Sequence, residues 1–409
     1  MKRWKKLLLL LLVLLAISQL PFVYRRYKLG RLQAAIQRLN SESVRSENLG
    51  GPTEFKGVIH VHSFLGGHST GTFADIISAA QANQLNFVVM TEHPSSNFNT
   101  AEMTLKGNHG GVLFVNGNEV STAQGDRLLL IPGDAQAADD GKGSTQEVLS
   151  RRSNGLSVVA YPQEFNGWGA SGYKGIEVYN VYTNARRINP VVMFFDALWS
   201  YRSYPDLLFA TFYERPNESL KLWDEQIKQR GERIVATAGN DAHANIGMSL
   251  NDSSGKTLLG FKLDPYERSF RLVRMHVLVN LPFSGLVNSR SLQEADLLEA
   301  ISAGHCFIGF DLFGDTTGFR YDAHDEDEDR MMGDEIKLGN EVRLTVGLPV
   351  AGRIVLLKDG VVVADKSAVS KMEFVTREKG SYRAEAYLPQ LPKPAGDQPW
   401  IISNPIYVR

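Results

Sequence analysis

Residues 58–62 (VIHVH) and 87–90 (FVVM) are short apolar stretches on either side of a helical stretch that begins at Thr72. Runs of β-branched and aromatic residues of this length predict strands. Thr72 and Asp75 have the spacing of a capping box, which marks the start of a helix. Residues 58–90 therefore predict a strand, a helix and a second strand in succession, the unit from which parallel sheets are built.

The same alternation continues along the chain. Strands are predicted at residues 112–115, 127–131, 156–160, 176–179 and 234–238, and helices from Ser144, with Glu147 as its capping partner, and over residues 217–230, just before Gly231. A chain of 409 residues with 43% hydrophobic residues has enough apolar material for two or three folded units. We therefore expect an α/β fold with a parallel sheet or barrel over residues 53–325.

The pattern changes near residue 325. Apolar and polar residues alternate at 343–348, 353–357, 361–363 and 382–387. Asp359 and Gly360 lie between two of these runs and are typical of a hairpin turn. We expect a small all-β, sandwich-like domain over residues 326–409. The acidic run at residues 325–329 is interpreted as a solvated loop, with a metal or partner site as the alternative.

The first 28 residues have the pattern of a signal anchor or signal peptide. Basic residues at positions 2, 3, 5 and 6 precede an apolar run over residues 7–15, and mostly apolar residues continue to position 24 before basic residues at 25, 26 and 28. This length is just enough to span a bilayer, so we expect an uncleaved membrane anchor with the rest of the chain outside the cytoplasm. The alternatives are secretion after cleavage at Ser18 and a buried core helix. Residues 29–52, a short helical stretch followed by polar and glycine residues, are expected to be a linker.

Charge and cysteine content limit what the chain can bind. Lys and Arg total 44 against 45 Asp and Glu, so no overall positive field favours nucleic acid. Cys306 is the single cysteine, which excludes an intramolecular disulfide and a Cys-rich zinc site. Imidazole and carboxylate groups remain as the ligands available for a metal ion.

Histidine and acidic residues follow the ends of several predicted strands. The most informative feature is two pairs of residues spaced two apart, His60 with His62 and Asp241 with His243. This spacing places both side chains of a pair on the same side of a strand. The residues are His60, His62, His68, His93, Glu119, Asp241 and His243. Because strand ends meet at one rim of a parallel barrel, we expect these side chains to converge.

A single histidine is more often a packed, hydrogen-bonded side chain than a ligand, but this joint pattern favours a metal site. Nitrogen and oxygen ligands suit zinc, manganese or iron. The other histidines lie in strand-like, helical or loop contexts and are expected to be structural. They are His109, His276, His305 and His324.

Five short motifs resemble the polymerase and histidinol phosphatase (PHP) superfamily of metal-dependent phosphoesterases. They are residues 59–62 (IHVH), 91–93 (TEH), 117–119 (GNE), 159–162 (VAYP) and 239–243 (GNDAH), and the resemblance covers roughly residues 54–250. Residues 175–180 (GIEVYN) and 399–405 (PWIISNP) are similar to the branch named after carbaryl hydrolase (CehA/McbA).

The resemblance implies a distorted (β/α)7 PHP-type barrel that holds up to three metal ions. One site would use His60, His62, Glu119 and Asp241, and another His68, His93 and His243, with Glu119 bridging to a middle site. At the middle site Asp126 and Tyr161 stand where the family has histidines, and neutral tyrosine is a poor ligand. We therefore expect two tightly bound divalent ions and a third that is weak or absent. Glu92 replaces the family's aspartate beside His93, which bears only on a supporting role.

The expected chemistry is metal-dependent hydrolysis, with a phosphate ester as substrate and a metal-bound hydroxide as nucleophile. No P-loop, dinucleotide fingerprint or Gly-x-Ser-x-Gly motif offers another mechanism. Catalytic roles are expected for His60, His62, Glu119, Asp241 and His243. Arg127, Arg186 and Arg187 are candidates for binding an anionic substrate, although loop arginines are more often simply solvated. The alternatives are a carbamate or carboxyl ester hydrolase on the same metal site, and a non-catalytic metal-binding surface protein.

Overall fold

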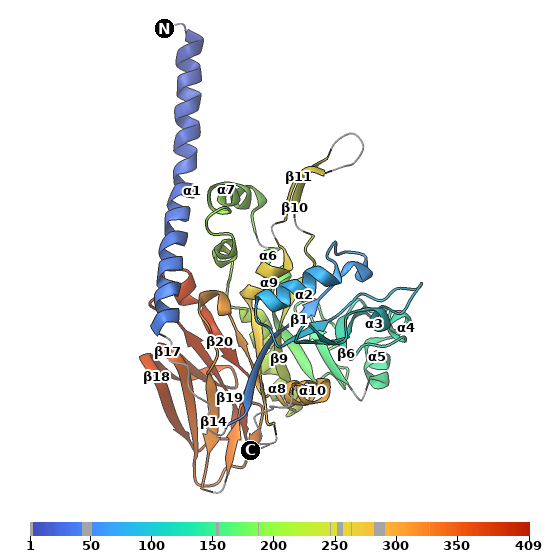
Figure 1. The fold of residues 1–409 in the computed structure, drawn as a ribbon. Coiled ribbons are helices and arrows are strands. Elements are labelled where there is room, and N and C mark those ends of the chain that lie inside the picture. The colour runs from blue at the N-terminus through green and yellow to red at the C-terminus, as the bar shows by residue number, and fades with distance from the viewer. Residues whose placement is uncertain are drawn as a thin grey trace.

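The computed structural model describes residues 3–42, 51–152, 155–186, 188–245, 247–251, 257–262, 264–281, 291–326 and 328–409. Parts of several predictions lie outside the described residues: residues 1–2 of the signal anchor, residues 43–50 of the linker, Arg187 and residue 327 of the acidic run. The chain forms a mixed α/β structure with a large mixed sheet, from which one long N-terminal helix projects (Figure 1).

The α/β part contains nine paired strands in the order β3-β4-β2-β1-β9-β8-β7-β6-β5. Their bounds are β1 Thr53–Val61, β2 Phe87–Met90, β3 Gly107–His109, β4 Val112–Val115, β5 Asn118–Ser121, β6 Arg127–Ile131, β7 Leu156–Ala160, β8 Gly175–Asn180 and β9 Val235–Ala242. The central neighbours are parallel, from β4 through β2, β1, β9 and β8 to β7. The predicted strand–helix–strand unit at residues 58–90 is therefore present.

The expectation of a parallel sheet is wrong at both ends of this order, where β3 runs antiparallel to β4 and β6 runs antiparallel to its neighbours. β6 runs antiparallel to both β5 and β7. Only residues 122–126 connect β5 to β6, and a connection this short closes a hairpin but cannot make the crossover that parallel strands need. β5 meets the chain just after β2 through an isolated bridge between Glu92 and Asn118 rather than through a ladder.

Helices cover this sheet where the sequence predicts them. The helices and 3₁₀ turns of this part are η1 Phe64–Gly66, α2 Phe73–Ala82, α3 Thr100–Met103, α4 Ala137–Asp140, α5 Thr145–Arg151, α6 Val181–Ala185, α7 Pro190–Ser200, η2 Asp206–Thr211, α8 Asn217–Arg230, α9 Tyr266–Leu272 and α10 Glu294–Ala303. Both predicted capping boxes form, at Thr72 and at Ser144. α8 has the predicted bounds and ends at Gly231, whose φ of 67° is left-handed.

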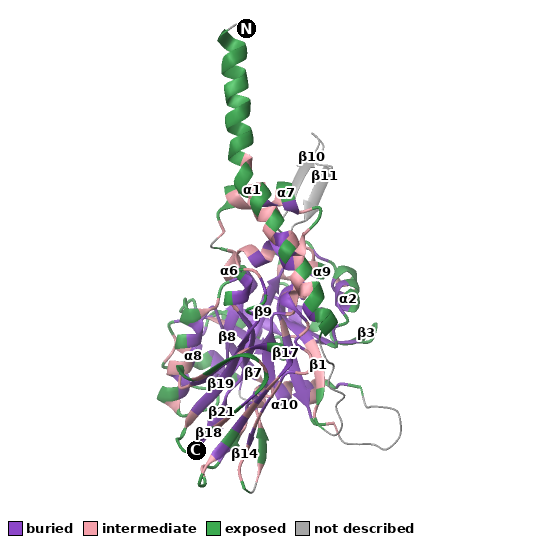
Figure 2. Cartoon of the chain, turned by 90° about the vertical axis from the view of Figure 1, so that its left-hand side faces the viewer, coloured by how far each residue is buried: buried purple, intermediate pink, exposed green. Residues whose placement is uncertain are grey.

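The C-terminal strands continue the same sheet. β12 pairs antiparallel with β1 on one side and with β13 on the other, and β13 leads through β20 and β19 to β17. The remaining bounds are β10 Gly247–Asn251, β11 Thr257–Lys262, β12 Arg274–Val279, β13 Cys306–Gly309, η3 Asp311–Phe313, β14 Arg320–His324, β15 Asp329–Met331, β16 Glu335–Ile336, β17 Val342–Lys358, β18 Val361–Thr376, β19 Gly380–Tyr387, η4 Ala395–Asp397, β20 Pro399–Ser403 and β21 Ile406–Val408. One buried core runs through both parts of the sheet (Figure 2).

The predicted hairpin at residues 359–360 is confirmed. It joins the long antiparallel strands β17 and β18, and Asp359 and Gly360 have φ values of 49° and 82°. Positive φ at both turn residues matches the twist of a two-residue hairpin. The expected boundary between residues 325 and 326 stays a prediction; β14 and β15 lie on its two sides and pair with each other.

The N-terminal segment is one helix, α1, from Arg3 to Glu42. It is long and apolar enough to cross a membrane, and its most apolar 18-residue window is wholly unburied (Figure 2). The helix continues without a break through the first part of the expected linker. There Leu29, Leu32 and Leu39 are buried against the folded body, so this half of α1 is packed rather than extended as a tether.

Candidate metal centre

Three of the site residues have a strained backbone conformation. His60, Tyr161 and Asp241 have φ values of 67°, 50° and 47°. Such values are costly for side chains other than glycine and persist where surrounding structure enforces them. At His60 the register of β1 shifts against both neighbouring strands, which marks a bulge between Ile59 and Val61. The site therefore lies at the carboxyl ends of the central strands, as predicted.

Four buried residues form the first group of possible ligands. One ligand atom from each of His60, His62, Glu119 and Asp241 lies within 4.8 Å of the others. Glu119 Oε2 is 3.2 Å from His60 Nε2 and 3.4 Å from His62 Nε2. Asp241 Oδ1 is 3.6 Å from each of the same nitrogens. The structure thus brings together the whole of the first predicted site.

Unpartnered polar atoms show that this group fits a cation. Both ring nitrogens of His62 and Oδ1 of Asp241 are buried and have no hydrogen-bond partner among the described residues. Buried polar atoms are almost always paired, and leaving one unpaired costs about 1–3 kcal/mol. Zinc, manganese and iron bind to sets of imidazole nitrogen and carboxylate oxygen atoms like the one formed here.

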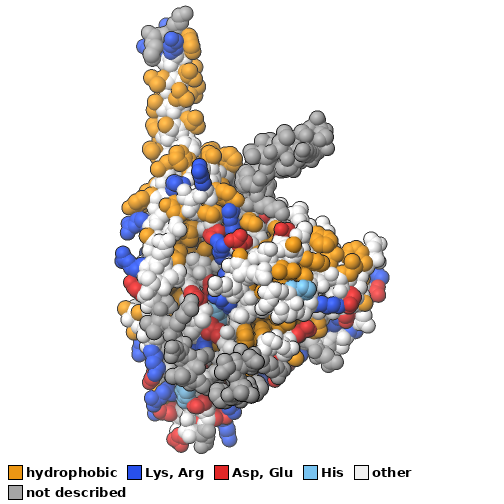
Figure 3. Space-filling view, in the orientation of Figure 1, with side chains coloured by type: hydrophobic (Ala, Val, Ile, Leu, Met, Phe, Trp, Pro, Cys, Tyr) orange, Lys and Arg blue, Asp and Glu red, His pale blue; other side chains and the backbone are white. Residues whose placement is uncertain are grey.

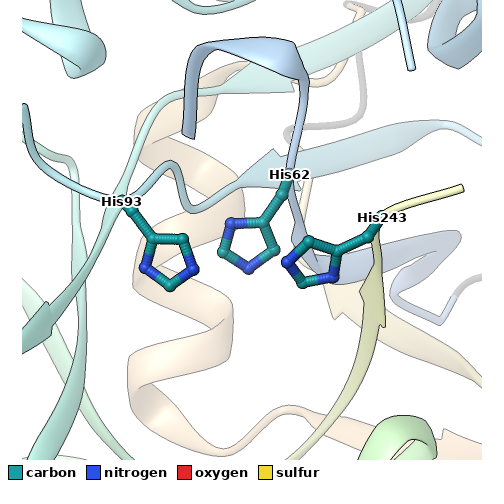
Figure 4. A group of neighbouring side chains, drawn as sticks. All are labelled: His62, His93 and His243. Atoms are coloured by element: carbon teal, nitrogen blue, oxygen red, sulfur yellow. The ribbon is translucent and has the colours of Figure 1, made fainter. Parts of the chain in front are cut away.

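A second group consists of three histidines, His62, His93 and His243 (Figure 4). The ring of His62 stacks between the other two, with ring centres 4.6 Å from His93 and 4.3 Å from His243. Glu119 Oε2 lies 3.5 Å from His93 Nε2, so the carboxylate of the first group also lies beside the second. His68 is exposed and meets His93 edge-on, with ring centres 5.0 Å apart, but it belongs to neither group among the described residues. Its role as a ligand stays a prediction.

Glu177 supports the site from behind, and sequence reasoning assigned it no role. Its Oε1 is 2.7 Å from Nδ1 of His60, and Asn180 donates to Oε2 at 2.8 Å. A carboxylate on the outer nitrogen fixes the tautomer that presents the inner nitrogen to a metal. The available signal was a charged residue inside strand β8, all of which is buried.

The electrostatics agree with a site built for positive charge. Burial opposes protonation of His60, but the surrounding carboxylates, led by Glu177, outweigh it and raise the pKa of His60 well above its ordinary value. Burial also opposes ionisation of Glu119, yet His60 holds the pKa of this carboxyl well below its usual range. Burial, followed by His243, lowers the pKa of His62, so this ring is neutral and able to ligate.

At the expected middle site, Asp126 and Tyr161 both form hydrogen bonds within the protein, the first as acceptor and the second as donor. Asp126 accepts hydrogen bonds from Asn166 N at 2.6 Å and from Thr145 Oγ1 at 2.5 Å. The hydroxyl of Tyr161 donates to Asp241 Oδ2 at 2.6 Å. Asp126 lies outside both groups of possible ligands among the described residues. Whether it binds a metal stays a prediction.

Arg127 occupies the free side of the shared carboxylate. Its Nη1 donates to Glu119 Oε1 at 2.8 Å, and its guanidinium lies 5.7 Å from the ring centre of Tyr161. Burial opposes the charge of Arg127, but Glu119 outweighs burial and raises the pKa of Arg127. The positive charge of Arg127 therefore lies beside the first group of possible ligands and is bonded to Oε1 of Glu119.

A cavity of about 590 Å³ is lined by four of the possible ligands, His93, Glu119, Asp241 and His243. Arg127, Tyr161, Tyr182 and Arg186 line it together with His68 and His93. Arg186 lies over the rings of Tyr182 and Tyr161, 5.0 and 6.0 Å from their centres. Its pKa is raised through hydrogen bonding to Tyr182 and through Glu164, whose carboxylate is 2.7 Å away. Two arginines thus face a cavity of the size of a small-molecule site.

The remaining predicted residues have structural partners. Glu92 accepts hydrogen bonds from Ser63 N, Ser63 Oγ and Thr104 Oγ1, which ties down the chain after His62 and agrees with a supporting role. The four histidines expected to be structural each have a partner outside the site: His109 with Lys106 O, His276 with Glu54 and Asp311, His305 with Asp334, and His324 with Asp329.

Comparisons with known proteins add little to this geometry. No family model and no curated protein matches the chain. A solved structure similar to it is the crystal structure of PsfC from Pseudomonas syringae PB-5123, at 14% sequence identity and a TM-score of 0.36. The match covers 61% of this chain and 90% of PsfC. A likeness at that level carries no argument about fold or function.

Proposed function

We propose that this protein is a metal-dependent hydrolase that acts on phosphate esters. The observation that carries the proposal is the set of buried, unpartnered atoms on His62 and Asp241. They lie among the other possible ligands, and Asp241 itself lines a cavity that Arg127 and Arg186 also line. A structural metal site is normally closed by its ligands, whereas a catalytic site keeps access for a substrate. Here the cavity gives that access.

Bound divalent ions would act as Lewis acids and activate water for attack on the ester. One ion would be held by His60, His62, Glu119 and Asp241. A second ion would be held by His93 and His243 together with either His62 or His68. The chain's own part is to orient the ligands, through Glu177 and Tyr161, and to receive the substrate. We propose that the chain holds two ions tightly. The middle position would hold an ion weakly or not at all, because Asp126 and Tyr161 form hydrogen bonds within the protein.

The arginines favour a phosphate ester over a carbamate or carboxyl ester. Arg127 and Arg186 both line the cavity, and guanidinium groups match the geometry and charge of phosphate oxygens. A neutral ester offers no charge for either guanidinium group to bind. The same cavity argues against a purely structural metal site.

We also propose that the sheet is a distorted (β/α)7 barrel of the PHP type. Support comes from seven strands in the order β2-β1-β9-β8-β7-β6-β5 and from the bridge between Glu92 and Asn118, which would join β5 to the chain just after β2. An experimental structure tests this: a continuous ring of these strands supports it, and a gap wider than a hydrogen bond between β2 and β5 contradicts it.

For localisation, we propose that α1 anchors the chain and that the folded body lies outside the cytoplasm. The support is the exposed apolar half of α1 and the basic residues that precede it. Protease added to intact spheroplasts should cleave the body. Complete protection of the body in intact spheroplasts, with cleavage after lysis, would contradict this orientation.

The activity is tested with a substrate panel of nitrophenyl phosphate, bis-nitrophenyl phosphate and nitrophenyl acetate, in the presence of manganese or zinc. We expect hydrolysis of a phosphate ester, and a fall to background in the His60→Ala and Asp241→Ala variants. His305→Ala is the matched control, because His305 is partly buried and paired but lies outside the site. A metal-loaded protein that cleaves none of the three substrates would support the non-catalytic alternative instead.

A further inference from the structure

Helix α7 carries a stripe of exposed, large apolar side chains. Val191, Phe194 and Leu198 expose 63%, 49% and 67% of their surface. Their spacing of three and then four residues places them on one face of the helix. Soluble surfaces rarely keep such a stripe bare, because it commonly marks a contact with a partner or a membrane.

Specific contacts fix α7 to α1. The rings of Phe22 and Phe195 lie 5.0 Å apart, and Trp199 Nε1 donates to Gln19 Oε1 at 3.0 Å. Arg25 forms an ion pair of 2.6 Å with Asp196, whose side chain is buried. The neighbouring Arg26 donates to the carbonyl of Trp199 and, at 2.9 Å, to Ser203 Oγ. The position of α7 along α1 is therefore set by the structure.

The contacted part of α1 is the lower end of its apolar span. Residues 7–24 of a helix rise roughly 27 Å, at about 1.5 Å per residue, which approaches the thickness of the hydrocarbon core. The contacted residues 19–26 then lead from the end of the hydrocarbon core into the membrane surface, where exposed Tyr24 and Tyr27 and the nearby basic residues are typical of the interface. Figure 3 shows the hydrophobic surface of α1 continuing onto the top of the body, where Figure 1 places α7.

We propose that α7 lies in the surface of the same bilayer that α1 spans, with Val191, Phe194 and Leu198 among the lipid acyl chains. The occupant of this face is a phospholipid membrane, because the apolar stripe is continuous with the membrane-spanning segment and rigidly joined to it. An amphipathic helix of this kind lies parallel to the membrane plane. The inference rests on α1 as an anchor and not on the metal chemistry.

The arrangement also brings the cavity near the membrane. Arg186, which lines the cavity, is four positions before Pro190 at the start of α7, a reach of at most roughly 14 Å. The wall of the cavity that carries Arg186 is thus held close to the lipid headgroups.

Site-directed fluorescence tests the proposal in the full-length chain. The native Cys306 is fully buried, so a single introduced cysteine can be labelled selectively. Leu198→Cys is the test position, and Val361→Cys on β18 is the matched control, because both native side chains are 67% exposed. The labelled proteins are reconstituted in vesicles of phosphatidylcholine and phosphatidylglycerol, and quenching is measured with doxyl-labelled lipid and with aqueous iodide.

We expect doxyl lipid to quench the label at position 198 several-fold more than the label at 361, and iodide to show the reverse order. Equal iodide quenching at both positions, in protein that resists carbonate extraction, would overturn the proposal while leaving the anchor intact. Protection of position 198 from both quenchers would overturn it too, because a protein surface would then cover α7. Extraction of the whole chain by carbonate would refute the anchor and the proposal together; substrate hydrolysis, measured separately, depends on neither.

Discussion

Replacement of Arg127 by methionine tests whether the fixed cation recognises phosphate. The substitution keeps the length of the side chain and removes the guanidinium that donates to Glu119 and faces the cavity. A hydrogen bond to a charged group contributes about 1.5–3 kcal/mol. The Arg127 side chain is 40% exposed, so solvent screening places the effect at the lower end. We therefore expect a loss of about tenfold in phosphate binding.

The assay compares inhibition by inorganic phosphate with turnover of two esters in the manganese-loaded enzyme. The inhibition constant for phosphate should rise about tenfold, and kcat/KM for nitrophenyl phosphate should fall by a similar factor, on the basis of the energy above. Hydrolysis of nitrophenyl acetate should change by less than about threefold, because that ester carries no charge for the guanidinium to bind. Arg343→Met is the control, since Arg343 forms an ion pair with Glu373 on the exposed sheet.

Metal content must be measured in the same samples, because the substitution also frees Glu119 Oε1. Equal losses on the charged and uncharged substrates would refute anion recognition and assign Arg127 to positioning Glu119. An unchanged inhibition constant for phosphate would refute any role in binding.

Three further predictions concern other parts of the chain. Burial opposes protonation of His276, but Asp311 outweighs burial and raises the pKa of His276 to about 9. The free energy of unfolding should therefore include about 3 kcal/mol that is present below pH 6.5 and lost as the pH rises towards 9. Denaturant unfolding should show this loss in the native protein and not in His276→Gln. The full-length chain should resist carbonate extraction, whereas a chain starting at Thr53 should be soluble and active but less stable to heat, because it lacks the buried Leu29. Tyr161→His should raise the metal content after dialysis from about two ions towards three, as ligand counting predicts; no rise in elemental analysis would show that the middle position stays closed without the tyrosine.

Much of the fold follows from local sequence signals, because caps and turns depend on a few neighbouring residues. Residues 217–230 form a helix with the predicted bounds, and Asp359 with Gly360 forms the predicted hairpin. Strand direction is not local. The antiparallel course of β6 depends on the short connection after β5 and on pairing with β7, neither of which hydrophobic periodicity records.

The extent of α1 and of β17 also escaped prediction. Polar residues after Leu39 indicated the end of a short helical stretch, yet packing of the apolar side of α1 against the body keeps it helical to Glu42. In β17, shifts of register between residues 347 and 354 allow one strand to continue across a stretch that contains Pro349 and Gly352. Tertiary contacts decide both cases.

At the site, residue types with unusual spacing were enough to predict that the possible ligands around His60 and Asp241 lie together. The supporting contacts were not accessible in the same way. Glu177 lies within the segment 175–180, but that resemblance assigned it no contact with His60. The bond from Arg127 to Glu119 depends on how β5 and β6 pair, with Ser121 opposite Arg127. Such contacts arise from the fold and not from spacing along the chain.

Elemental analysis of the purified protein and of its His62→Ala variant is the most direct test of the metal centre. His62 belongs to both groups of possible ligands, and both of its nitrogens are buried without a partner among the described residues. We predict about two tightly held divalent ions in the native chain, inferred from ligand counting, and loss of both in the variant, while circular dichroism shows the same fold. A native chain that holds no ion after loading and dialysis, or a variant that keeps the full complement, would contradict the assignment.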